Sequence, residues 1–237
     1  MPIITDELEL LDSLVGLHQR PRIIELGCGA AQLSRSLLAR FTSCEVSALE
    51  VDERQHTKNL LQPEARLHFL QAGAQAIPFA ADQFDLALML KSLHHIPLEL
   101  IDQALAEVHR VLRPGGLLYV SEPVFAGTHN EIMRLFHDEE QVRAAALRAV
   151  HQAVAAGGWE QVAEVFFAMP VRYRDFAEFA QRLIAITYLD HQLDAATLSA
   201  VRERFEPHMG ADGALFVRPM RVNLLRRRAP AGASTTP

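Results

Sequence analysis

The most informative part of the sequence is Ile23-Ile24-Glu25-Leu26-Gly27-Cys28-Gly29-Ala30-Ala31, which an amphipathic run at 34–41 follows. The pattern predicts a buried strand, a glycine turn and the start of a helix. Glycine at 27 allows a sharp backbone turn, and glycine at 29 removes the Cβ that would keep a ligand away from the main chain. A nucleoside-bearing ligand would fit this turn, but a tight turn between strand and helix with no ligand has the same pattern.

A carboxylate ends the next predicted strand. Glu50 closes the apolar stretch at 45–49. It follows the glycines by about twenty residues, the interval that places an acid beside the ribose of a bound nucleoside. A nicotinamide dinucleotide and S-adenosylmethionine (SAM) both fit these two features, so both remain open at this point.

Four stretches together resemble the class I SAM-dependent methyltransferases, in particular the small-molecule, methyltransferase type 11-like group. They are Glu25–Gly29, Ala48–Asp52, Ala76–Phe79 with Phe84-Asp85, and Leu93-His94-His95 leading to Leu112–Gly116. Their order and spacing match that family between residues 20 and 125, approximately. A NAD-dependent dehydrogenase is not expected to carry the Pro-Phe, Phe-Asp and Arg-Pro-Gly-Gly series. The resemblance implies methyl transfer from SAM, with S-adenosylhomocysteine (SAH) as the product.

Length and composition agree with one domain, expected over residues 1–228 with a disordered tail at 229–237. A chain of 237 residues that is 49% hydrophobic can bury a large core. The net charge of −6 argues against a nucleic-acid partner, because phosphate binding needs a concentrated basic surface. Two cysteines without disulfide spacing, and no long apolar run or signal sequence, predict a cytoplasmic protein that has no membrane partner.

Alternating segments predict a Rossmann-like, doubly wound α/β fold with a mostly parallel sheet of seven strands. Strands are expected at 22–26, 45–49, 66–71, 84–90 and 117–121, and helices at 31–40, 53–60 and 98–111. Thr5 is the expected cap of a helix within 1–20, and Asp52 is the expected cap of the helix at 53–60.

The last third of the chain has a different pattern. It predicts a helical stretch at 130–156, a strand at 160–171, helices at 175–187 and 195–206, and a strand at 214–226. The resemblance implies that the two late strands form an antiparallel edge hairpin, with helical lid segments at 123–158 and 173–210. Pro219 cannot donate to a strand ladder, so it predicts a bulge or a free edge.

The resemblance also implies a set of cofactor contacts. The main chain at Gly27 and Gly29 would face the aminoacyl part of SAM, and Glu50 would accept from the ribose hydroxyls. Glu25 would lie near the amino group of SAM or brace the loop. The remaining expected contacts are Cys28, Val51, Gly73, Ala74, Leu90 and Lys91, the last of which could equally be a solvated loop residue.

Two positions depart from the family pattern. Ala31 stands where many relatives have a third glycine, and alanine still allows close packing. Gly73 stands where relatives commonly have an aspartate that accepts from the adenine amino group. The backbone at Gly73 and Ala74, with or without help from Gln75, would then have to recognise adenine, which could weaken SAM binding.

Methyl transfer from a sulfonium needs little beyond placement of the acceptor, and a base matters only when the acceptor carries a proton. His94 and His95 follow a predicted strand and are the candidate bases, with a packing or loop-bracing role as the alternative. The lid segments offer His129, Arg134, Tyr188 and His191 as candidate contacts to a small-molecule acceptor. No metal centre is expected from the 11 scattered histidines.

Other functions remain open. A methyltransferase acting on protein or RNA would need a docking surface that the sequence does not reveal. A non-catalytic protein that binds SAM or SAH is the second alternative, because the usual adenine-site aspartate is missing.

Overall fold

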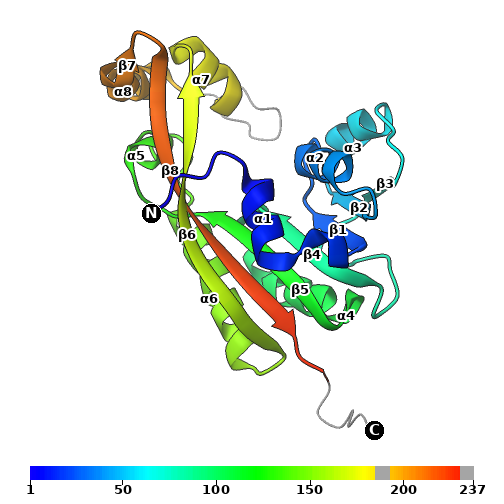
Figure 1. The fold of residues 1–237 in the computed structure, drawn as a ribbon. Coiled ribbons are helices and arrows are strands. Elements are labelled where there is room, and N and C mark those ends of the chain that lie inside the picture. The colour runs from blue at the N-terminus through cyan, green and yellow to red at the C-terminus, as the bar shows by residue number, and fades with distance from the viewer. Residues whose placement is uncertain (185–192, 230–237) are drawn as a thin grey trace, which may run out of the picture. The chain divides into compact units, whose positions relative to one another are not determined.

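The computed structural model describes residues 1–184 and 193–229 (Figure 1). Its backbone contacts divide the chain into two compact units. The sheet unit comprises Asp6–Glu122, Ala144–Val165 and Val222–Pro237, and the helical unit comprises Met1–Thr5, Pro123–Arg143 and Phe166–Arg221.

A mixed sheet is the centre of the fold. Its strand order is β3 (Leu67–Gln71), β2 (Glu45–Glu50), β1 (Arg22–Leu26), β4 (Phe84–Leu90), β5 (Leu112–Pro123), β8 (Gly213–Arg227) and β6 (Trp159–Tyr173). The first five are parallel neighbours and the C-terminal strands are antiparallel, which confirms the predicted architecture. The described sheet has eight strands rather than seven, because the short β7 (Met209–Gly210) pairs with β8.

The helices that follow the first parallel strands lie close to their predicted positions. They are α2 (Gln32–Arg40) after β1, α3 (Glu53–Leu60) after β2 and α4 (Ile101–Val111) before β5. Asp52 caps α3 as predicted, since its carboxylate accepts from the backbone N–H of Arg54 at 2.9 Å. The prediction that Thr5 caps α1 (Glu7–Val15) is wrong: Asp6 takes that place and accepts from Leu8.

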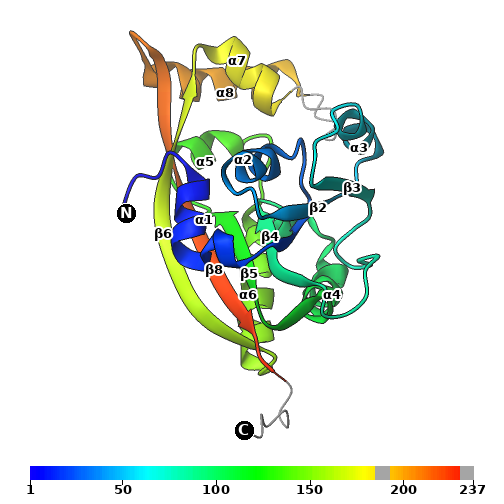
Figure 2. The same cartoon turned by 45° about the vertical axis from the view of Figure 1, so that its right-hand side comes forward.

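The core of the sheet unit explains why α4 forms where it does. Its buried residues recur with the period of a helix and form one apolar stripe: Ile101, Ala104, Leu105, Val108 and Val111. This stripe packs into a cluster with β1, β4 and β5 and with α6 (Glu140–Ala155). Figure 2 shows α1 beside α2, and the two helices are in contact.

The helical unit has its own aromatic core. The helices α5 (Thr128–Met133), α7 (Phe176–Leu183) and α8 (Ala195–Phe205) bury the side chains of Tyr173, Phe176, Phe179, Phe205 and Phe216. Extended backbone at the N-terminus lies beside β6, where the N–H of Ile4 donates to Ala168 at 2.9 Å.

One prediction for this part of the chain is wrong, and one of the two alternatives for Pro219 is excluded. The stretch at 130–156 is not one helix, because α5 ends at Met133 and α6 begins at Glu140, where Asp138 accepts from the backbone N–H of Glu140. Pro219 does not mark a free edge, because β8 lies between β5 and β6. Its carbonyl accepts from Val124 at 2.9 Å.

No helix within residues 1–184 and 193–229 is both long and apolar enough to cross a bilayer.

Candidate cofactor site

The glycine turn after β1 has a left-handed backbone at both glycines. Gly27 has a φ of 71° and Gly29 a φ of 53°. A Cβ on Gly27 would lie 2.7 Å from the Cβ of Ser92, whereas a Cβ on Gly29 would meet no atom within 4 Å. Gly27 is therefore required by packing, and Gly29 borders open space that a cofactor could enter. Ala31, at the position of the third glycine, has a φ of 54°, so alanine there has backbone strain that glycine would avoid.

Glu50 ties the end of β2 to this turn. The residue is 8% exposed, and its carboxylate accepts from the backbone N–H of Gly29 at 2.8 Å and of Asp52 at 2.9 Å. Each carboxylate oxygen can accept further hydrogen bonds, so these contacts leave capacity for a ribose. The buried Asn59 of α3 also holds the turn, through a 2.8 Å bond to the carbonyl of Gly29. The sequence analysis missed Asn59, because no motif marks a residue on the following helix.

Glu25 lies next to the turn in β1 and is almost completely buried. Burial raises the pKa of its carboxyl group to about 7, although the hydrogen bond donated by Ser34 of α2 opposes that shift. This contact shows that Glu25 braces the start of α2. A positive charge from a ligand would favour the ionised carboxylate over the neutral acid.

Lys91 follows β4 and joins α1 to the sheet. It has a φ of 56°, and its backbone N–H donates to the carbonyl of Ser121 at 2.7 Å. Its ammonium group lies 3.1 Å from the carboxylate of Glu7, the first residue of α1. Lys91 is therefore a bracing residue as well as a predicted cofactor contact.

The other predicted contacts differ in exposure. Val51, directly after Glu50, is 65% exposed although it is apolar. Cys28 and Ala74 are buried and Leu90 is half-buried. Burial raises the pKa of the Cys28 thiol, so this cysteine is not an activated nucleophile.

Three residues of α4 hold the loop that follows β3. The amide of Gln103 donates to the carbonyl of Gln75 at 2.9 Å, and Glu107 accepts from the backbone N–H of Ile77 at 3.0 Å. Arg110 donates to the carbonyls of Ile77 and Phe79 and pairs with Glu107. The predicted adenine-binding loop is therefore fixed at several main-chain groups. Sequence analysis missed these contacts, because they join residues about thirty positions apart.

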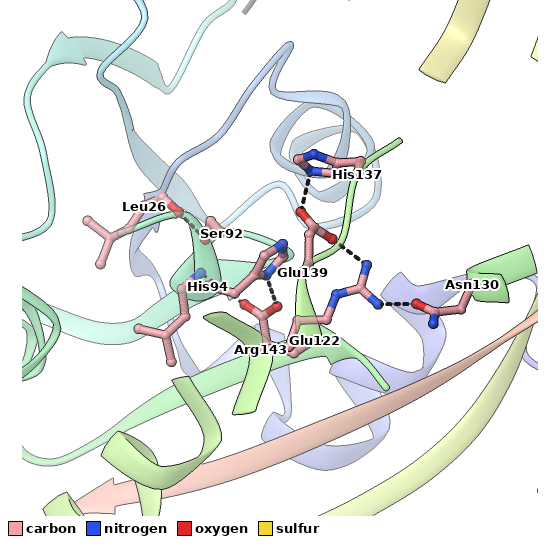
Figure 3. Close-up of polar contacts among 9 residues, drawn as sticks. Leu26, Ser92, His94, Glu122, Asn130, His137, Glu139 and Arg143 are labelled. Atoms are coloured by element: carbon pink, nitrogen blue, oxygen red, sulfur yellow. Dashed lines mark hydrogen bonds and ion pairs between the residues drawn. The ribbon is translucent and has the colours of Figure 1, made fainter. Parts of the chain in front are cut away.

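His94 forms a buried hydrogen bond with Glu122, a residue near the end of β5 that the sequence analysis missed (Figure 3). One oxygen of Glu122 contacts Nδ1 of His94, and the other accepts from the backbone N–H of Leu93 at 2.9 Å. This arrangement fixes the ring of His94 at the end of β4, whereas His95 is exposed.

The predicted acceptor contacts that the structure describes lie in the helical unit. His129 is buried in the aromatic cluster, where its Nε2 lies 2.8 Å from the hydroxyl of Tyr173. Burial lowers the pKa of the His129 imidazole to about 3. Arg134 is partly exposed and lies near Glu131, Asp138 and Glu140. Tyr188 and His191 lie outside the described residues.

A polar network connects α5 to the start of α6 (Figure 3). The guanidinium of Arg143 donates to Asn130 at 2.9 Å and pairs with Glu139, whose second oxygen lies 2.8 Å from Nε2 of His137. This network supports the turn that divides the predicted long helix.

Comparison with known proteins agrees with this geometry. Residues 23–116 match the family described as a methyltransferase domain. The methyltransferase GfsG of Streptomyces halstedii is 32% identical over 115 residues, which are 47% of this chain and 41% of that protein. The chain spans less than half the length of the curated relatives that it matches first.

Solved structures extend the likeness of the fold to most of the chain. The YcgJ protein of Bacillus subtilis superposes with a TM-score of 0.63 at 15% identity, covering 94% of this chain and 98% of that one. A geranyl diphosphate methyltransferase in complex with SAM superposes with a TM-score of 0.56 at 17% identity, covering 93% and 84%. At these identities the likeness concerns the fold alone.

Proposed function

We propose that this chain is a class I SAM-dependent methyltransferase, which transfers the methyl group of SAM to a small-molecule acceptor. The observation that carries the proposal is the junction of β1 and β2, where the buried Glu50 accepts from Gly29 beside an open glycine turn. A Cβ-free backbone next to an anchored carboxylate fits an aminoacyl group and a ribose. The exposed Val51 offers an apolar surface next to that carboxylate.

SAM supplies an electrophilic methyl group when it is bound, so this chain has to bind it, orient it and manage the proton of the acceptor. Glu50 would hold the ribose hydroxyls, and the main chain at Gly27 and Gly29 would approach the aminoacyl part. Glu25 would provide a carboxylate for the amino group.

His94 is the candidate base for an acceptor that carries a proton. The contact with Glu122 favours the tautomer with a proton on Nδ1, which makes Nε2 the basic nitrogen. The carboxylate also stabilises the imidazolium that forms when Nε2 takes a proton. Glu122 is in this scheme a positioning residue that acts through His94.

Calorimetric titration with SAH tests the cofactor assignment. Replacing Glu50 by alanine removes hydrogen bonds to a charged group, so we expect SAH binding to weaken by roughly ten- to a hundredfold. Glu53→Ala is the matched control, because Glu53 is an exposed acid in the first turn of α3. Unchanged affinity in folded Glu50→Ala protein would overturn the ribose assignment.

Transfer of a labelled methyl group from SAM then tests the reaction. The acceptors should include small carboxylic acids, phenols and amines, with an unrelated protein and an RNA as alternatives. Transfer to one small-molecule class supports the proposal. Tight SAH binding without transfer to any of them would favour the non-catalytic alternative.

A further inference from the structure

The loop after β3 holds a glutamine side chain in the place of the missing aspartate. Gly73 is not among the residues with positive φ, so its backbone does not itself require glycine. A Cβ built on Gly73 would nevertheless lie 2.3 Å from Oε1 and 2.7 Å from Nε2 of Gln75. The amide of Gln75 therefore folds back over Gly73 and occupies the space that a side chain at position 73 would need.

This distance can be compared with the geometry of an aspartate side chain. A carboxylate oxygen lies about 2.4 Å from the Cβ of its own residue, by ordinary bond lengths and angles. Oε1 of Gln75 lies at nearly the same distance from the Cβ position of Gly73. A glutamine two positions along the chain thus holds an oxygen at the distance from this Cβ position that an aspartate oxygen would have, and glycine at 73 leaves room for it.

We propose that Gln75 recognises the adenine of the cofactor, with Oε1 accepting from the 6-amino group and Nε2 donating to N1. This inference rests on the proposed function, since it assumes that SAM or SAH binds here. On this proposal, Gly73 does not mean that an adenine contact is lost. Glycine at 73 and glutamine at 75 together replace the usual aspartate. The chain retains a specific adenine site, built from another residue.

The surroundings of Gln75 support this role. Its backbone carbonyl is held by Gln103, and Ile77 is held by Glu107 and Arg110. The loop backbone is therefore fixed, while the Gln75 amide makes no hydrogen bond to any residue in the described part of the chain. Because the loop is fixed, its backbone loses little conformational freedom when a base binds, and the Gln75 amide is available to pair with that base.

An amide and a carboxylate differ in which bases they accept. An ionised carboxylate can only accept hydrogen bonds, whereas an amide both donates and accepts. Hypoxanthine has a carbonyl in place of the 6-amino group and a proton on N1. Gln75 could rotate its amide by half a turn and pair with hypoxanthine, but a carboxylate would face the carbonyl oxygen without a donor.

The experiment is calorimetric titration with SAH and with its hypoxanthine analogue, S-inosylhomocysteine. We expect the unmodified protein to bind the two within about fivefold, and Gln75→Ala to weaken both by about tenfold, as for the loss of one or two hydrogen bonds. Gln75→Glu keeps the acceptor for the 6-amino group and loses the donor to N1, so it should bind SAH more weakly than the unmodified protein and more tightly than Gln75→Ala, and it should weaken the analogue by a further tenfold or more. Gln62→Ala, which alters an exposed glutamine, is the control and should change neither.

A second variant tests the pairing with Gly73. In the Gln75→Ala background, Gly73→Asp should restore SAH binding and leave the analogue weak, because only an acceptor returns. Unchanged SAH affinity in Gln75→Ala, or no rescue by Gly73→Asp in a protein that is folded by circular dichroism, would overturn the inference. Failure of the unmodified protein to bind SAH at all would instead overturn the proposed function.

Discussion

Gly27 and Gly29 share a left-handed backbone but differ in their surroundings, and this difference can be measured. Alanine at either position should cost about 1–2 kcal/mol of backbone strain. At Gly27 the new Cβ would also lie 2.7 Å from the Cβ of Ser92, and such overpacking costs a further 1–3 kcal/mol or so. We expect urea denaturation without cofactor to show a larger loss for Gly27→Ala than for Gly29→Ala. Equal losses would show that Ser92 moves without cost.

The raised pKa of Glu25 predicts that cofactor binding depends on pH. Its pKa is raised to about 7, so the folded protein holds a proton that the unfolded chain has lost above its ordinary pKa of 4.5. The contribution of this group to stability therefore falls as the pH rises from about 4.5 to 7 and is constant above that range.

The amino group of bound SAH should favour the ionised carboxylate of Glu25. The affinity for SAH should therefore rise as the pH rises through the pKa of about 7. Between pH 6 and pH 8 we expect the dissociation constant of SAH to fall by roughly tenfold. Glu25→Gln removes the titration and keeps a side chain that can contact Ser34, so its affinity should be nearly flat over this range. A slope in Glu25→Gln equal to that of the unmodified protein would assign the dependence to another group.

Among individual residues, those that belong to a local sequence motif could be predicted. Gly27 and Gly29 were identifiable because a sharp turn favours glycine, and Glu50 because an acid ends the next strand about twenty residues later. Asn59, Gln103 and Glu122 were not, because each acts on a backbone group or side chain that only the fold brings near. The role of Gln75 also needed coordinates, since its amide folds back over a neighbour in the same loop.

Between elements, Glu122 of β5 holds the turn that follows β4. Because it contacts both Leu93 and His94, its removal should alter the position and basicity of the His94 ring. For an acceptor that carries a proton, we expect Glu122→Gln to lower kcat by about tenfold to a hundredfold and to change SAH affinity little. The kcat–pH profile should shift to lower pH, because the imidazolium loses a charged partner.

His95→Gln is the matched control, since His95 is the adjacent histidine and is exposed. It should leave the pH profile unchanged if His94 alone is the base. A Glu122→Gln protein with lower kcat but an unshifted profile would assign Glu122 a purely structural role. A normal kcat would remove the pair from the reaction.

The elements themselves were predictable where periodicity was strong. The helix at 53–60 and the strand at 84–90 were placed at the observed bounds, because capping or continuous burial marks their ends. The end of α5 was missed, because no glycine or proline stands between Met133 and Glu140. The aspartate that accepts from Glu140 at the start of α6, Asp138, lies inside this stretch and was not recognised as the start of a new helix.

For the whole molecule, most of the connections between the two units lie inside regular structure. The chain passes between the units at five points, four of which fall within β5, α6, β6 and β8. A single strand that contributes to both units cannot lose its structure in one without exposing backbone groups in the other. We therefore expect one cooperative unfolding transition.

Two probes check this expectation. Trp159, the single tryptophan, is buried in the sheet unit, and hydrogen exchange of α8 reports on the helical unit. The urea midpoints from tryptophan fluorescence and from exchange of α8 should coincide. At about 100 times its dissociation constant, SAH should raise the free energy of unfolding by roughly 2.7 kcal/mol at both probes. Since the predicted cofactor contacts all lie in the sheet unit, stabilisation of Trp159 without stabilisation of α8 would show that the units unfold separately.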